Sequence, residues 1–175
     1  AEPLFQLLSD HMHRLIDSFG SEANAQHRFE QFLGAMNETI AGQVRDGHWN
    51  IPIHEFNAVV GIACDDKIFL SGTGDLCVLF LHRKPSQRYQ VFNLFRSIQT
   101  EQSLPTWEKA FAVVLDGDLH DGDVFAVSNQ DLQRTVGTSE LNSILTTLPP
   151  TGSTEKIRQY FSEKTSLSLN VLKMA

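Results

Sequence analysis

The sequence lacks a surplus of positive charge. It has 14 Lys and Arg residues against 21 Asp and Glu residues, which gives a formal net charge of -7. A protein that binds nucleic acid through the phosphate backbone needs a basic face that displaces counterions. The acidic balance therefore argues against nucleic acid as a partner.

The sequence also lacks a hydrophobic run long enough to cross a membrane. Its longest apolar stretches, 58–64 and 76–81, are far shorter than the ~20 residues that span a bilayer. The first residues show no basic segment followed by an apolar stretch, so no signal peptide is expected. We predict that the protein has no membrane partner.

Cysteine is scarce, with only two residues, Cys64 and Cys77, and both lie in apolar, strand-like runs. A reduced thiol in such a run behaves as a small hydrophobic side chain. A chain of 175 residues can bury a core without a disulfide or a metal. We therefore expect a single domain over residues 1–175 and a cytoplasmic location.

Hydrophobic periodicity predicts helices toward both ends of the chain and strands between them. Apolar residues recur every three or four positions over 4–19 and again over 24–44, which indicates two amphipathic helices. Turn pairs such as Asp65-Asp66 then separate short apolar runs, as in antiparallel hairpins. We expect strands over 56–64, 67–73, 76–83, 89–95, 110–116 and 124–128, a surface loop over 96–108, a helix over 139–148, a second helix capped by Ser153 or Thr154, and a last strand over 167–174.

This order of elements predicts an α+β protein. Strands as apolar as 56–64 and 76–81 need cover on both faces, which two stacked sheets with helices outside would provide. The expected fold is a four-layer α-β-β-α sandwich of antiparallel sheets with flanking helices.

Two segments resemble the type 2C metal-dependent serine/threonine phosphatases. Residues 57–81, NAVVGIACDDKIFLSGTGDLCVLFL, are similar to that family's hairpin, T-T-A-x-x-A-x-I-x-x-x-x-L-x-V-A-N-x-G-D-S-R-x-x-L. Residues 119–130, LHDGDVFAVSNQ, are similar to its segment L-x-x-G-D-x-L-L-L-x-S-D-G, and 165–169 lie where the family has D-N-x-S-V. The resemblance implies the family's α-β-β-α fold.

The resemblance also implies where metal ligands would lie. In the family, carboxylates hold two divalent cations that position and deprotonate the attacking water. The D-G-x-G-G turn that supplies the first carboxylate does not occur in the sequence, so the expected domain lacks the N-terminal metal-ligand strands. Asn129 stands at the Asp of S-D-G and Thr165 at the Asp of D-N, which leaves Asp75 as a vestigial metal candidate.

Amide and hydroxyl groups bind Mg²⁺ or Mn²⁺ more weakly than carboxylates do. The resemblance therefore implies a catalytically silent relative, with no catalytic residue and no cofactor.

A second polar cluster, residues 116–123, reads DGDLHDGD. Four carboxylates and a histidine suggest a metal site, but the spacing does not fit the calcium helix-loop-helix motif, and Asp and Gly are common in turns. We predict a solvated turn here. The histidines His11, His13, His48 and His54 lack a partner in ligand spacing, so we expect them on the surface.

Three functions remain open. The first is a non-catalytic phosphatase-like domain that binds another protein or forms a homodimer, because a bare strand edge at 56–64 or 76–81 could accept a strand from another chain. The second is an active Mg/Mn-dependent protein serine/threonine phosphatase whose N-terminal ligand segment lies outside this chain. The third is an unrelated α+β sandwich that binds a small molecule. The substitutions at Asn129 and Thr165 favour the first.

Overall fold

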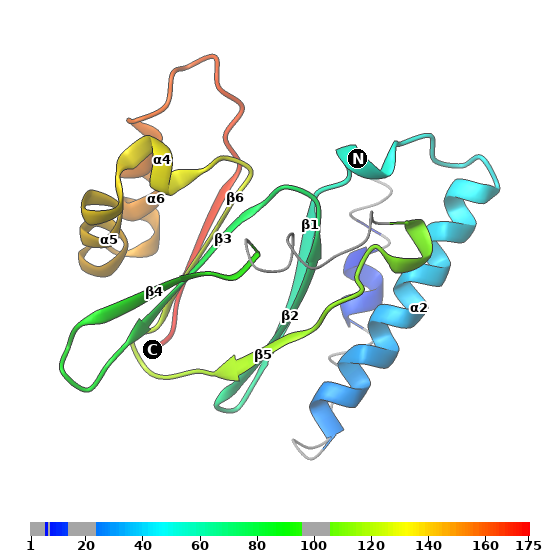
Figure 1. Cartoon of the computed structure of the whole chain (residues 1–175), viewed down its shortest axis with the longest axis horizontal. Coiled ribbons are helices and arrows are strands. Elements are labelled where there is room, and N and C mark those ends of the chain that lie inside the picture. The colour runs from blue at the N-terminus through cyan, green and yellow to red at the C-terminus, as the bar shows by residue number, and fades with distance from the viewer. Residues whose placement is uncertain (1–5, 7, 14–23, 96–105) are drawn as a thin grey trace. The chain divides into compact units, whose positions relative to one another are not determined.

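A computed structural model describes residues 6, 8–13, 24–95 and 106–175 (Figure 1). Its internal contacts group the chain into two units that are both discontinuous in sequence. The first unit comprises residues 1–74 and 103–118, and the second comprises residues 75–102 and 119–175. Each unit contains one antiparallel sheet with helices.

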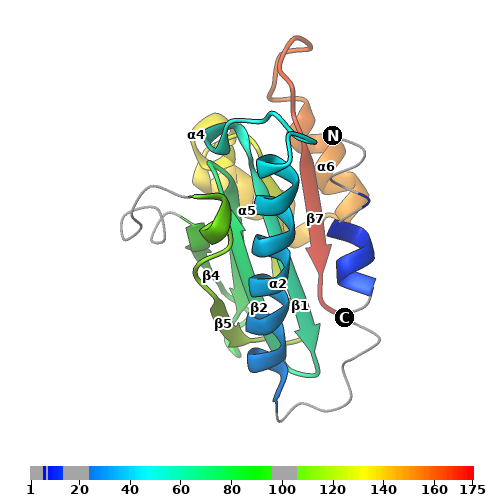
Figure 2. The ribbon, with the colours of Figure 1, turned by 90° about the vertical axis from the view of Figure 1, so that its right-hand side faces the viewer.

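The first unit contains a long helix and a three-stranded sheet in the order β1-β2-β5. The elements are α2 (Ala25–Arg45), β1 (Ala58–Cys64), β2 (Lys67–Thr73) and β5 (Leu115–Asp118), with single 3-10 turns at Ile53–Glu55 and Trp107–Lys109. Figure 2 shows α2 running along this sheet. The apolar stripe of the helix, which includes Phe29, Met36 and Ile40, is fully buried and packs with Phe69 and Phe111. This packing of an amphipathic stripe forms the core of the first unit.

The second unit contains a four-stranded sheet in the order β4-β3-β6-β7 and three short helices. The elements are β3 (Cys77–Arg83), β4 (Tyr89–Asn93), β6 (Val124–Ser128), α4 (Leu132–Val136), α5 (Thr138–Thr147), α6 (Pro150–Arg158) and β7 (Leu169–Lys173). Alternate strand residues such as Leu79 and Ala126 pack against helix residues such as Leu141, Leu145 and Ile157. The strands therefore bury one face under the helices, as their period of two requires.

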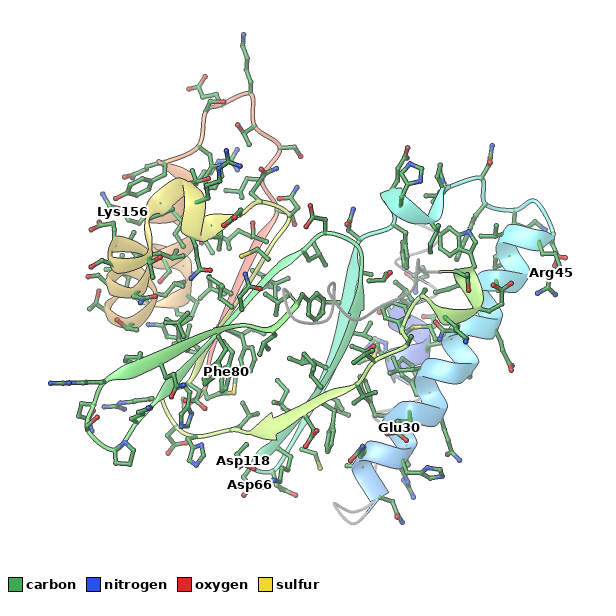
Figure 3. All side chains as sticks on the ribbon, in the orientation of Figure 1. Glu30, Arg45, Asp66, Phe80, Asp118 and Lys156 are labelled. Carbon is green, nitrogen blue, oxygen red and sulfur yellow. The ribbon has the colours of Figure 1, made fainter. Side chains whose placement is uncertain are left out.

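The opposite face of this sheet carries a row of aromatic rings. Phe80 of β3, labelled in Figure 3, stacks on Phe125 of β6 with 4.6 Å between ring centroids and on Phe92 of β4 at 6.1 Å. The ring of His82 lies 5.9 Å from that of Phe80 on the same face. His82, near the end of β3, therefore packs beside this row of rings.

Most of the predicted elements are present. The strands expected over 67–73 and 124–128 have those bounds, and the Asp65-Asp66 hairpin turn is present with Asp65 at φ 51°, a conformation that Asp tolerates. Residues 6 and 8–13 are helical, whereas the expected end of that helix near residue 19 and most of the loop over 96–108 lie outside the described residues. None of the described helices is long and apolar enough to cross a membrane.

The strand expected to begin at residue 110 begins at Leu115. The preceding segment is tied to α2 instead, because the buried side chain of Asn37 donates a hydrogen bond to the carbonyl of Phe111 (3.1 Å) and accepts one from its backbone amide (3.0 Å). A backbone whose polar groups are satisfied by a side chain has no need of a strand partner.

The C-terminal helices also differ from expectation. The first of them, α5, ends at Thr147, before Pro149 and Pro150, but α6 already begins at Pro150, ahead of the expected cap at Ser153 or Thr154, because a first-turn residue needs no backbone donor. Ser153 is not a cap: it is buried, and its hydroxyl donates to the carbonyls of Ile144 and Leu148. The short helix α4 was not predicted, although Asp131 caps it by accepting from the Arg134 amide at 3.0 Å.

One expected bare edge is wrong. The strand predicted over 76–81 forms β3, which lies between β4 and β6 and is paired on both sides. The other candidate, β1, lies at an edge of its sheet, since β2 is its sole strand neighbour among the residues that the structure describes.

Candidate functional site

A polar hollow of about 320 Å³ lies in the second unit, where β3 begins and β6 ends. It is lined by Asp75, Leu76, Cys77, Asn93, Asn129, Gln130, Asp131 and Arg134. Two of the three predicted site residues, Asp75 and Asn129, therefore lie in the same hollow. Carboxylate, amide and guanidinium groups from the turn before β3, the end of β4, the β6–α4 connection and α4 line it.

Gly74 sets the turn that leads into Asp75 and β3. It has φ 82°, and a Cβ at this position would lie 2.2 Å from Oδ1 of Asn57 and 2.5 Å from the carbonyl of Phe56. Only glycine satisfies both constraints. The backbone conformation and the close packing at this turn therefore explain why the Gly-Asp pair of the resembled motif has glycine in its first position.

Asn129 follows the last residue of β6 and fastens the segment before β7. Its Nδ2 donates to the carbonyl of Ser166 at 3.2 Å, and its Oδ1 accepts from the backbone amide of Ser168 at 2.8 Å. The side chain of Gln130 also donates to the Ser166 carbonyl, at 3.2 Å. Both polar atoms of the Asn129 amide are therefore engaged, and a carboxylate could not make the first of these bonds because it has no donor.

Thr165 does not line the hollow that contains the other two predicted residues. It lines a different hollow of about 480 Å³, together with residues of α6 and the following loop. Its Oγ1 lies 2.9 Å from the hydroxyl of Ser162, and its backbone amide donates to the carbonyl of the same residue. Thr165 thus stabilises a turn after α6.

Cys77 also lines the hollow that contains Asp75 and Asn129, and its thiol is a potentially reactive group. Burial raises the pKa of its thiol, the charges of Asp131 and Asp75 raise it further, and a hydrogen bond with the backbone of Leu132 lowers it in part. A thiol with a raised pKa carries little thiolate at neutral pH. Cys77 packs in the core of the second unit, and its raised pKa does not favour a nucleophilic role.

The acidic segment 116–123 is divided between two environments. Asp118, at the end of β5 beside the β1–β2 turn (Figure 3), pairs with the exposed Lys67 and raises the pKa of that amine. Asp123 is completely buried: its Oδ1 accepts from the Arg83 amide at 2.7 Å and its Oδ2 from the His120 amide at 2.9 Å. The expectation of a solvated turn is wrong for Asp123.

Two histidines join Asp123 at this position. Nδ1 of His82 lies 3.2 Å from Oδ1 of Asp123, and Nδ1 of His120 lies 4.0 Å from its Oδ2. Within the described part of the chain, this is the one group of three or more His, Cys, Asp or Glu side chains close enough to share a cation. Local spacing places only His120 near Asp123 and does not reveal His82, which is 41 positions from Asp123. The strand register, with Leu81 opposite Val124, is the feature that could have revealed it.

No family model and no curated protein match the sequence. Solved structures do match. The catalytic domain of serine/threonine protein phosphatase PstP in complex with 2 manganese ions is similar with a TM-score of 0.64 at 12% identity, over 99% of this chain and 82% of that one. The Mycobacterium tuberculosis serine/threonine phosphatase PstP/Ppp gives 0.65 at 11%, with the same coverage.

A third similar structure is PppA, described as a key regulatory component of the T6SS in Pseudomonas aeruginosa. Its TM-score is 0.59 at 11% identity, over 96% of this chain and 80% of that one. Together these likenesses show that the chain has a type 2C phosphatase-like fold. They confirm the predicted α+β class with two antiparallel sheets and flanking helices.

Proposed function

We propose that this chain is a non-catalytic type 2C phosphatase-like domain that acts by binding another protein. The observation that carries this proposal is the side chain of Asn129, whose two polar atoms both bond the backbone before β7. The resemblance places a metal-binding carboxylate at this position. Here the side chain is a structural fastener: its Nδ2 donates to Ser166, and its neutral Oδ1, which accepts from Ser168, is a weaker ligand for a hard cation than a carboxylate.

The remaining donors do not fit a pair of Mg²⁺ or Mn²⁺ ions. Such hard cations require several carboxylate oxygens. In the hollow, Asp131 caps α4 through the Arg134 amide, and Thr165 lies in the other hollow. The hollow thus contains two carboxylates, Asp75 and Asp131, one oxygen of the latter being used by the helix cap, where the resembled family uses several carboxylates. We derive no phosphate-transfer step through this hollow.

The edge of β1 supports protein binding. This strand, AVVGIAC, carries no charged residue and no proline along its seven residues. Lysine, proline and bulges are the usual devices that protect an edge from pairing. A second copy of the chain could add its own β1 through main-chain hydrogen bonds, which gives a symmetric dimer. That PppA, of the same fold, is a regulatory component supports a regulatory role.

The proposal includes a cytoplasmic location. The two cysteines are reduced thiols, and Cys77 is buried in the core of the second unit. Free thiols are typical of reducing compartments.

Hydrolysis of p-nitrophenyl phosphate in the presence of Mn²⁺ or Mg²⁺ tests the lack of catalysis. We expect background turnover from the unmodified chain and from Asn129→Asp, because one restored carboxylate does not complete a two-metal centre. Metal-dependent turnover by the unmodified chain would instead support an active phosphatase.

Light scattering tests association. We expect a mass above the 19.6 kDa of one chain, and a shift to the monomer in Ala63→Lys, which places a charge at an exposed position of β1. Ala112→Lys, also exposed in the first unit, is the matched control and should leave the mass unchanged. A monodisperse monomer of the unmodified chain would contradict self-association.

A further inference from the structure

We propose that His82, His120 and Asp123 form a binding site for one transition-metal cation of the zinc class. The site lies where β3 ends and β6 begins, and therefore at the opposite end of this strand pair from the hollow that contains Asp75 and Asn129. It is independent of the proposed function, because none of its residues lines that hollow.

The distances between the donor atoms suit a small cation. Zinc lies about 2.0–2.1 Å from imidazole nitrogen and about 2.0–2.2 Å from carboxylate oxygen, so tetrahedral ligand atoms are about 3.4 Å apart. Nδ1 of His82 is 3.2 Å from one Asp123 oxygen and 3.3 Å from the other. Nδ1 of His120 is 4.0 Å from Oδ2, which a small rotation of this exposed ring would close.

The carboxylate is held rigidly in place. An ionised carboxylate has about four acceptor positions, and the amides of Arg83 and His120 use one on each oxygen of Asp123, which leaves positions for a cation. Such hydrogen bonds to a ligating carboxylate are the usual outer-shell support of a metal site.

The turn that carries His120 and Asp123 is equally fixed. The amide of Asp123 donates to the carbonyl of His120, and the carbonyl of Asp123 accepts from the amide of Met174. Gly122 has φ 86°, and a Cβ there would lie 2.6 Å from the Arg83 side chain, so the close approach of this turn to β3 requires glycine. The donors therefore stand on a strand end and a clamped turn rather than on a loose loop.

A hydrogen bond between His82 and Asp123 would explain those two residues without a metal. It does not explain His120, whose ring lies edge to face against that of His82 with 5.0 Å between centroids and whose side chain is 58% exposed. Two imidazoles that converge on one buried carboxylate, with one imidazole open to solvent, provide both the ligands and an entry path.

The ligand types determine which cation would bind. Two imidazoles and one carboxylate select zinc, copper, nickel or cobalt over magnesium and calcium, which prefer oxygen ligands. Three protein ligands leave the fourth tetrahedral position for water or an exogenous group.

Titration of the full chain with Co²⁺, followed by visible absorption, tests the site. We expect one Co²⁺ per chain, with the intense bands of four-coordinate cobalt, displacement by Zn²⁺, and no competition from Mg²⁺. His120→Ala should weaken binding about 100-fold or more, since loss of outer-shell partners alone costs 10–100-fold. Because His120 is exposed, this variant should keep its fold, which circular dichroism checks.

Two control variants separate this site from others. His48→Ala removes an exposed histidine outside the cluster, and Asp75→Ala removes the carboxylate of the other hollow; both should bind Co²⁺ as the unmodified chain does. Absence of cobalt and zinc binding, or equal binding by folded His120→Ala, would overturn the proposal.

Discussion

The two units use buried polar side chains in different ways. In the first unit, Asn37 joins the middle of α2 to Phe111 within a core of aromatic and aliphatic side chains. In the second unit, polar side chains at strand ends hold the loops: Asp123 where β6 begins and Asn129 where it ends. Strand ends are where a sheet protein commonly displays its functional groups. In this chain the Asn129 position serves as a fastener, while Asp123 combines a fastening role with two histidines that face it.

The largest expected difference between the units concerns Asp123. Asp123→Ala removes a fully buried carboxylate that accepts from the amides of Arg83 and His120, so we expect a loss of about 3 kcal/mol in the free energy of unfolding. Urea denaturation measures this loss. The matched control in the first unit is Asp118→Ala, which removes an exposed ion pair with Lys67 and should change the free energy of unfolding by less than about 1 kcal/mol. Equal midpoints for the two variants would contradict the role assigned to Asp123.

Asn37 should be the corresponding residue of the first unit, with a smaller effect. Asn37→Ala removes two hydrogen bonds to Phe111 and should lower the free energy of unfolding by about 2 kcal/mol. Asn50→Ala, at an exposed position of the same unit, is the control and should leave thermal unfolding unchanged. If Asn37→Ala unfolds at the same temperature as Asn50→Ala, the link between α2 and Phe111 contributes no stability.

The effect of Asn129 should be smaller still, because this side chain is exposed. Asn129→Asp keeps an acceptor for the Ser168 amide but loses the donor to the Ser166 carbonyl, so we expect a cost of about 1 kcal/mol. Addition of Mn²⁺ should not restore the loss. A stability gain in Asn129→Asp that depends on Mn²⁺ would mean that the carboxylate binds metal, contrary to the proposed function.

Local patterns predicted much of the fold. The hairpin with the Asp65-Asp66 turn and the strand over 124–128 follow from short-range rules of turn chemistry and alternation. The start of β5 was missed because Asn37, far away in sequence, satisfies the backbone of Phe111. Local pattern contains no information on such a partner.

The polar sites also differ in how much of them local sequence patterns could predict. Asp75 and Asn129 could be placed from motif resemblance, since each follows a recognisable strand. The cluster at Asp123 could not, because it depends on the pairing register of β3 with β6, which brings His82 next to the turn. Predicted strand bounds determine a register only when the connection is short, and here residues 84–123 separate the two strands.

The smallest effect is chemical and compares one cysteine from each unit. Cys64, at the end of β1, is partly exposed, whereas Cys77 is buried and has a raised pKa because of burial and the nearby charges of Asp131 and Asp75. In the native protein at mildly alkaline pH, iodoacetamide should therefore modify Cys64 first and Cys77 only slowly, since the thiolate is the reactive form. Peptide mass spectrometry over time measures both rates, and denaturant should remove the difference. Faster modification of Cys77 than of Cys64 in the folded chain would contradict this prediction. It would mean that the hollow at Asp75 activates the Cys77 thiol as a nucleophile.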